Sequence, residues 1–130
     1  MKKTYRGSCH CGAVRFEADI DLAAGTVKCN CTMCRKSRNW LAAVGPDAFR
    51  LLTDDAELSR YEFGRHTIHH RFCRRCGLRP FSHKSDQSFY AVNIACLDDV
   101  DTAELIAAPV AYVDGLHDDF KNPPKETRHL

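Results

Sequence analysis

Seven of the eight cysteines fall into three short clusters, and their spacing is typical of metal ligands. In C-x-C and C-x-x-C patterns, neighbouring thiolates can reach one zinc ion at about 2.3 Å without distorting the backbone. The eighth, Cys96, lies between apolar neighbours, where a lone cysteine is usually a small core residue. The sequence therefore predicts that metal ions share the following thiols: Cys9, Cys11, Cys29, Cys31, Cys34, Cys73 and Cys76.

The two outer pairs share a feature that the central cluster lacks. Glycine follows directly after Cys11 and after Cys76, which suits a tight turn whose backbone N–H groups point at the sulfurs. Four thiolates from two such turns would close a tetrahedral zinc site. We expect Cys9, Cys11, Cys73 and Cys76 to form this site, with the structural role of clamping distant segments together.

The central cluster supplies three ligands, Cys29, Cys31 and Cys34, and is followed by Arg35 and Lys36 instead of glycine. Three protein ligands plus an open position are typical of a catalytic zinc, whereas a closed set of four is structural. We therefore expect two zinc ions per chain, one structural and one catalytic. The alternative is a second structural site, completed by Cys96 or by a histidine.

The sequence after the triplet favours anionic chemistry at that metal. A helix beginning near Thr32 would direct free N–H groups at the thiolates and, together with Arg35, lower the pKa of Cys34. A zinc ion with three thiolates carries one negative charge, and a substrate thiolate would add a second. Arg35, Lys36 and Arg38 are the cations expected to offset that charge.

Composition and charge exclude several function classes. The chain has 130 residues and a formal net charge of +2, far from the basic excess of a general nucleic-acid binder. No run reaches the ~20 apolar residues of a membrane span, and the start lacks the apolar core of a secretory signal. We expect a cytoplasmic protein whose cysteines serve metals instead of disulfides. Nothing in the sequence indicates an oligomeric state.

Short alternating runs and frequent turn residues predict a mainly β fold. We expect one zinc-binding domain over residues 1–113 and an irregular tail over 114–130. Only two short helices are expected, over 32–38 and 101–107. The predicted strands are 13–19, 25–28, 40–44, 58–64, 67–72, 79–83, 89–95 and 109–113.

Several motifs together resemble a known family. The motifs are Gly7–Gly12, Cys29–Arg35, Tyr61–Phe63, Arg71–Gly77 and Val92–Asp98. They are similar to those of the glutathione-dependent formaldehyde-activating enzymes, which share their domain with centromere protein V. The resemblance implies an Mss4-like β-tent with short strands around zinc knuckles, and the division into structural and catalytic zinc described above.

The same resemblance implies a carbon–sulfur lyase that acts on a small thiol or thiol adduct, such as that of glutathione with formaldehyde. The main alternative is a zinc-stabilised binding module with two structural sites and no catalysis. A rubredoxin-like iron centre is a more distant alternative. Three histidines on an expected hairpin, His66, His69 and His70, are candidates for a ligand or a general base, although hydrogen-bonded histidines are more common there.

Overall fold

The computed structural model describes residues 1–130 and is mainly β. Its ten strands are all short. They are β1 (Lys3–Ser8), β2 (Arg15–Ile20), β3 (Thr26–Cys29), β4 (Leu41–Val44), β5 (Phe49–Leu51), β6 (Leu58–Tyr61), β7 (Ile68–Cys73), β8 (Phe81–Lys84), β9 (Tyr90–Asn93) and β10 (Val110–Val113). The helices are α1 (Thr32–Ser37) and α2 (Thr102–Ala107), with 3₁₀ turns η1 (Leu22–Ala24), η2 (Pro46–Ala48), η3 (Asp55–Glu57), η4 (Ile94–Cys96) and η5 (Gly115–His117).

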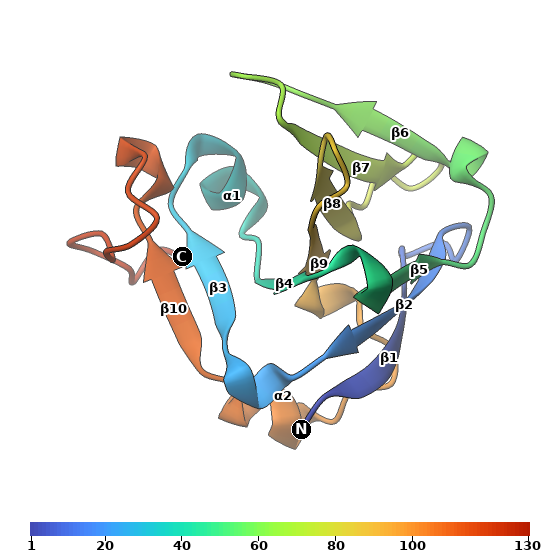
Figure 1. The fold of residues 1–130 in the computed structure, drawn as a ribbon, viewed down its shortest axis with the longest axis horizontal. Coiled ribbons are helices and arrows are strands. Elements are labelled where there is room, and N and C mark those ends of the chain that lie inside the picture. The colour runs from blue at the N-terminus through green and yellow to red at the C-terminus, as the bar shows by residue number, and fades with distance from the viewer.

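The strands form two sheets. One has the order β1-β2-β5 and the other the order β10-β3-β4-β9-β8-β7-β6. Figure 1 shows that β3 and β10 form one arm of the larger sheet and β6 and β7 the other, while β4 and β9 join them. The helix α1 lies at the end of β3, between the two arms. This arrangement confirms the predicted β-tent.

The parallel pairing of β10 with β3 determines what surrounds the central cysteines. Val113, the last residue of β10, pairs with Cys29, the last residue of β3. The chain therefore enters the segment after Val113 directly beside the triplet. Because parallel strands need a long connection, a neighbour more than eighty residues away could not be identified from local sequence pattern.

The core lies between the sheets and follows from strand alternation. In β2, Phe16, Ala18 and Ile20 are buried, while the residues between them are only partly covered. The Phe16 ring stacks on Phe49 at 5.5 Å, and Phe49 in turn stacks on Tyr90 at 4.5 Å. These contacts fix the smaller sheet, whose β1–β2 connection carries Cys9 and Cys11, against the centre of the larger one, whose arms carry the other clustered cysteines.

Two strands were not predicted from the sequence. β1 pairs with β2 along its whole length, and Tyr5 is buried on one side of it. β5 has only three residues, which is too short for a periodic pattern, and it exists because it pairs with β2. The predicted helices agree with α1 and α2 to within a residue. Neither helix is long and apolar enough to span a membrane.

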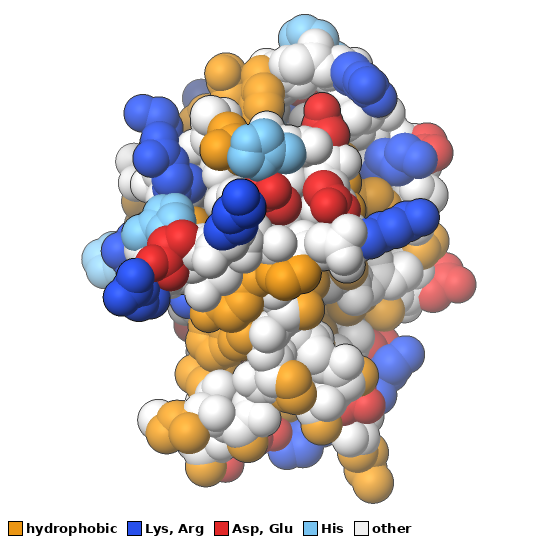
Figure 2. Space-filling model, turned by 90° about the vertical axis from the view of Figure 1, so that its left-hand side faces the viewer, with side chains coloured by type: hydrophobic (Ala, Val, Ile, Leu, Met, Phe, Trp, Pro, Cys, Tyr) orange, Lys and Arg blue, Asp and Glu red, His pale blue; other side chains and the backbone are white.

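The surface shows no large field of one charge on the face seen in Figure 2. Lysine, arginine and acidic side chains are interspersed there, with apolar side chains between and below them. This mixed pattern gives that face no strong attraction for a polyanion.

Candidate metal centres

The outer cysteine pairs come together as one group of four sulfurs. All four sulfurs lie within 4.8 Å of one another. The Cys9 and Cys11 sulfurs are 3.6 Å apart, as are those of Cys11 and Cys73. Sulfurs at about 2.3 Å from a tetrahedral zinc would be separated by roughly 3.8 Å. The donor set therefore fits a closed zinc site made by Cys9, Cys11, Cys73 and Cys76.

The two halves of this centre are similar turns. The backbone N–H of Cys9 donates to the carbonyl of Val14 at 3.0 Å, and that of Cys73 donates to the carbonyl of Leu78 at 2.9 Å. Each turn passes through a glycine with positive φ, +81° at Gly12 and +78° at Gly77. Side chains other than glycine are strained at such angles. This geometry explains why glycine follows the second cysteine of each pair.

Backbone N–H groups in these turns favour thiolates. Burial opposes ionisation of Cys73, but the N–H groups of Arg75 and Cys76 donate to its sulfur at 3.4 and 3.5 Å, and its pKa is lowered on balance. Hydrogen bonds from the N–H groups of Leu78 and Cys11 lower the pKa of Cys76 to about 6. A thiolate stabilised in this way is ready to bind a metal without losing a proton first.

The central cysteines form a separate group of three. The sulfurs of Cys29, Cys31 and Cys34 lie within 4.8 Å of one another, and the group contains no histidine, aspartate, glutamate or fourth cysteine. The three sulfurs also fit a zinc ion, with a fourth position left for another ligand. Cys96 belongs to neither group: it is buried, and burial raises its pKa to about 12.

Each sulfur of the triplet accepts an N–H group. The backbone N–H of Cys31 donates to Cys29 at 3.4 Å, and that of Cys34 donates to Cys31 at 3.3 Å. The side-chain amide of Asn39, which is buried, donates to Cys34 at 3.5 Å. These donors orient the thiolates and reduce their charge, as groups around metal ligands commonly do.

The helix N-terminus acts on Cys31 and not on Cys34, contrary to our expectation from the sequence. Cys31 is the N-cap of α1. Hydrogen bonds from the thiols of Cys29 and Cys34, and from the backbone of Cys34, lower the pKa of Cys31 to about 2. Hydrogen bonding to Cys29 and Cys31, followed by burial, raises the pKa of Cys34. Cys34 is the third residue of α1, and its sulfur accepts from the side-chain amide of Asn39, whereas the sulfur of Cys31 accepts a backbone N–H of the helix.

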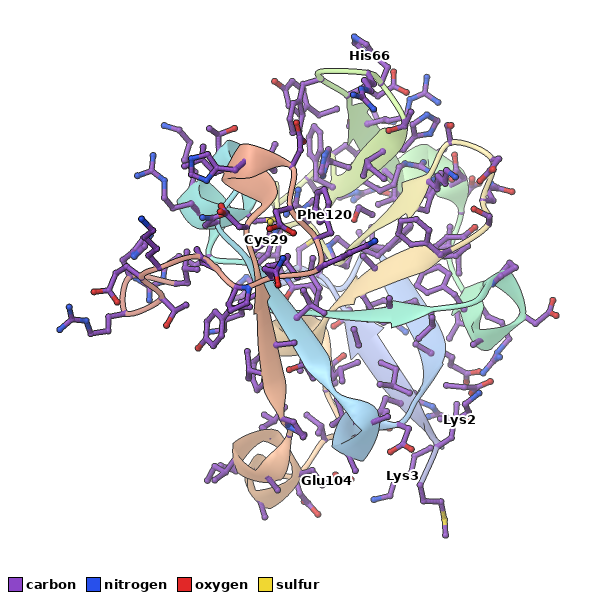
Figure 3. The ribbon with its side chains drawn as sticks, turned by 60° about the vertical axis from the view of Figure 1, so that its left-hand side comes forward. Lys2, Lys3, Cys29, His66, Glu104 and Phe120 are labelled. Atoms are coloured by element: carbon purple, nitrogen blue, oxygen red, sulfur yellow. The ribbon has the colours of Figure 1, made fainter.

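The segment after β10 packs against the triplet. The amide of Asn30 donates to the carboxylate of Asp114 at 2.8 Å, and its oxygen accepts the backbone N–H of Leu116 at 3.0 Å. A Cβ added to Gly115 would lie 2.4 Å from the sulfur of Cys29, so only glycine fits there. In Figure 3 Phe120, which belongs to the same segment, lies beside Cys29. The beginning of the tail therefore forms one side of the triplet centre.

A further cation near the triplet, Arg79, comes from the segment between β7 and β8. Arg35 and Lys36 are exposed on α1. Arg79 is half-buried, and the negative charges of Cys34 and Cys31 act on its pKa, which burial lowers on balance. Its Nη1 donates to Nδ1 of His70 at 2.6 Å. Arg79 is thus the cation that faces the thiolates from the opposite arm.

The histidines of the hairpin do not join the triplet. His69 pairs with Glu62, and its ring contacts that of His83 at 5.1 Å. His70 is buried and stacks on Phe63 at 5.4 Å. His66 is exposed. None of them belongs to a group that could hold a metal, so hydrogen bonding and packing occupy those that are buried.

Sequence reasoning missed three parts of this site. Arg79 lies in a segment rich in basic residues after Cys73. That concentration of positive charge was the one sequence feature that could have indicated a cation near the thiolates. Asn39 and Gly115 gave no signal, because their roles depend on contacts made only in the folded chain. The cysteine clusters themselves are brought together in the two groups that the spacing predicts.

Comparison with known proteins agrees with this geometry. Residues 4–113 match the family described as glutathione-dependent formaldehyde-activating enzyme. A crystal structure of a protein from Rhodobacter sphaeroides is similar, with 31% identity and a TM-score of 0.70, and the match covers 82% of this chain and 99% of that one. The chain therefore belongs to the glutathione-dependent formaldehyde-activating enzyme family.

Proposed function

We propose that this chain is a zinc-dependent carbon–sulfur lyase that acts on the adduct of a small thiol with an aldehyde, of the glutathione and formaldehyde type. The observation that carries the proposal is the difference in ligand number: one cysteine group has four sulfurs and the other has three. The closed group has the ligand count of a structural zinc, and the triplet has that of a catalytic one. Membership of the family supports the thiol and the aldehyde as substrates.

The reaction needs little beyond an ionised thiol and a polarised carbonyl. In the forward direction sulfur bonds to the carbonyl carbon, the π electrons move to oxygen, and oxygen gains the proton that the thiol loses. The lyase direction reverses these changes. Zinc held by Cys29, Cys31 and Cys34 would supply the means to keep a thiol ionised at neutral pH and to polarise an oxygen.

The residues around the triplet would leave one side of it open to a substrate. Asn39 and the N-terminus of α1 hold the sulfurs from within the fold. Gly115 and the beginning of the tail cover the side of Cys29. Arg79 approaches from the arm that carries β7. Substrate would then enter between the tail and that arm.

The experiment measures exchange between free formaldehyde and its glutathione adduct by NMR exchange spectroscopy. This adduct also forms without a catalyst, so the exchange rate must rise in proportion to the concentration of zinc-loaded protein. Cys34→Ser is the matched control, because it removes one triplet ligand and leaves the four-cysteine group complete. We expect the control to return the rate to that of buffer.

An exchange rate equal to that of Cys34→Ser, for glutathione and for a panel of other small thiols, would contradict the proposal. The binding-module interpretation, with two structural zinc ions, would then account better for the triplet.

A further inference from the structure

Arg79 differs from the other partly buried arginines in having no carboxylate partner. Arg50 pairs with Asp19 and Arg71 pairs with Asp55, at 3.0 and 2.8 Å. The side-chain partners of Arg79 are neutral: Nδ1 of His70 at 2.6 Å and the hydroxyl of Ser37 at 3.3 Å. A half-buried guanidinium without a counter-ion is costly, and such a group usually has a charge to meet.

His70 holds one end of this guanidinium as a neutral ring. Burial, followed by the charge of Arg79, lowers the pKa of His70 to about 4. Because a guanidinium can only donate, Nδ1 must accept and the proton must be on Nε2. Stacking on Phe63, with an angle of 15° between the rings, fixes the plane of the imidazole. His70 therefore acts as a rigid acceptor that orients Arg79.

Ser37 holds the other end from the opposite arm. Its hydroxyl donates to the carbonyl of Met33 at 2.6 Å, so its oxygen is left to accept from Arg79. The backbone carbonyl of Arg79 accepts the amide of Asn93 at 3.1 Å. The side chain consequently spans from β7 to α1, with its charge close to the helix that carries Cys34.

The negative charge expected at a metal-loaded triplet accounts for a cation beside it. Three thiolates and a divalent ion leave one negative charge, which Arg79 can neutralise. A thiolate arriving as the fourth ligand adds another negative charge, and a partly desolvated centre accepts it more readily beside a fixed cation. Exposed cations such as Arg35 and Lys36 act weakly by comparison, because water and salt screen them.

We propose that Arg79, oriented by His70 and Ser37, is the positioning residue that enables the triplet to take an anionic thiolate as its fourth ligand. The proposal rests on the proposed function in one respect, namely that a thiol binds at this centre. It extends that function by assigning selectivity for thiolate over neutral ligands to a residue outside the metal ligands. The thiol proton is released to solvent when the thiolate binds.

The test titrates cobalt-substituted protein with 2-mercaptoethanol and follows the sulfur-to-cobalt charge-transfer and d–d bands. This probe has no charge other than its thiolate, so it isolates the effect of Arg79 on that group. We expect Arg79→Gln to weaken binding about tenfold or more, as for a fixed unit charge near a partly buried site. Arg79→Lys should stay within about threefold of the original chain, because it keeps the charge but loses the forked geometry.

Arg35→Gln and Lys36→Gln are matched controls, since they remove cations from the exposed face of α1. Each should weaken binding by less than about twofold, and 0.5 M salt should abolish that difference. The effect of Arg79→Gln should persist in the same salt, because the side chain is half-buried.

Three results would overturn the assignment. The first is equal 2-mercaptoethanol affinity in Arg79→Gln and the original chain. The second is an effect seen with glutathione but not with 2-mercaptoethanol, which would mean that Arg79 binds a carboxylate of the ligand. The third is loss of the second metal ion from Arg79→Gln and from Arg79→Met, which would make Arg79 a support for the metal. If the original chain binds no thiol at all, the proposed function fails instead.

Discussion

The two cysteine groups solve different problems with the same ligand. The group of four joins segments that are far apart, since Cys11 and Cys73 are separated by 62 positions. The triplet takes all its sulfurs from one short segment, Cys29–Cys34, and the groups that surround it come from elsewhere. A metal in the first group would cross-link the chain, whereas a metal in the second would only complete a local turn. The comparison indicates that the two groups differ in how far apart their ligands lie in the chain, and not in ligand type.

The residues around the two cysteine groups also differ. The group of four lies in two glycine turns that repeat the same backbone pattern. The triplet lies at a helix N-terminus with one buried amide, one close glycine and one half-buried cation around it. A symmetric closed site leaves nothing for a substrate to contact. The uneven surroundings of the triplet offer a substrate several kinds of contact.

The largest expected effect comes from removing one ligand from each group. Cys73→Ser should prevent stable folding or lower the melting temperature by tens of degrees, because zinc binding contributes on the order of 10 kcal/mol in small zinc domains. Cys34→Ser should leave a cooperative transition only a few degrees lower. Thermal unfolding followed by circular dichroism measures both. Equal losses of stability would indicate two structural sites.

Next in size is the substitution Gly115→Ala, which places a methyl group 2.4 Å from the sulfur of Cys29. Either the tail or the cysteine must move, so we expect the triplet to lose its metal while the group of four keeps its own. Gly45→Ala is the matched control, because a Cβ there contacts nothing within 4 Å. Metal content by elemental analysis should fall toward one ion for Gly115→Ala and stay at two for the control. Unchanged content in both variants would refute the role of the tail.

A smaller effect is expected for Asn39→Ala, which removes the amide that donates to Cys34 at 3.5 Å. Loss of such a donor commonly weakens metal binding by about 10-fold to 100-fold. Competition with a chromogenic chelator should show this change in the weaker site alone. Asn122→Ala, on the exposed tail, should behave as the original chain does. A change in the tighter site would mean that Asn39 acts on the whole fold.

The smallest effect concerns His70, which should remain neutral with its proton on Nε2. Folding lowers its pKa to about 4, from an ordinary value near ~6.5. The charged form is disfavoured in the folded state, so this residue's contribution to stability is fully present above pH ~6.5 and is lost as pH falls toward ~4. Histidine ¹⁵N and ¹³C shifts report both the tautomer and the pKa. A Nδ1–H tautomer would contradict the hydrogen bond to Arg79.

The sequence was informative where chemistry is local. Cysteine spacing and the glycines after Cys11 and Cys76 predicted which sulfurs meet, and alternation in residues 13–19 predicted β2. It was silent where tertiary contacts decide. The three-residue strand β5 has no pattern of its own, and the parallel pairing of β10 with β3 depends on a long connection.

The same limit explains what the sequence could not show at the site. The sequence indicated Arg35, Lys36 and Arg38 as the cations beside the thiolates, because they follow Cys34 closely. In the fold Arg35 is exposed, and Arg79 approaches from the segment between β7 and β8. The effect of the helix N-terminus was assigned one turn too late, because capping by a cysteine at position 31 was not foreseen. Closeness in the sequence therefore does not identify which cationic side chain lies near the thiolates in the fold.

The central claim is that the chain holds two metal ions, one in a site closed by four cysteines and one in a site with three cysteines and an open position. Its most direct test is zinc release from fresh, reduced protein, with total zinc measured by elemental analysis and release followed with a chromogenic chelator. We predict two zinc ions per chain that leave in two phases of equal amplitude, with Cys34→Ser lacking the fast phase. One zinc per chain, or two that leave together in a single phase, would contradict the account.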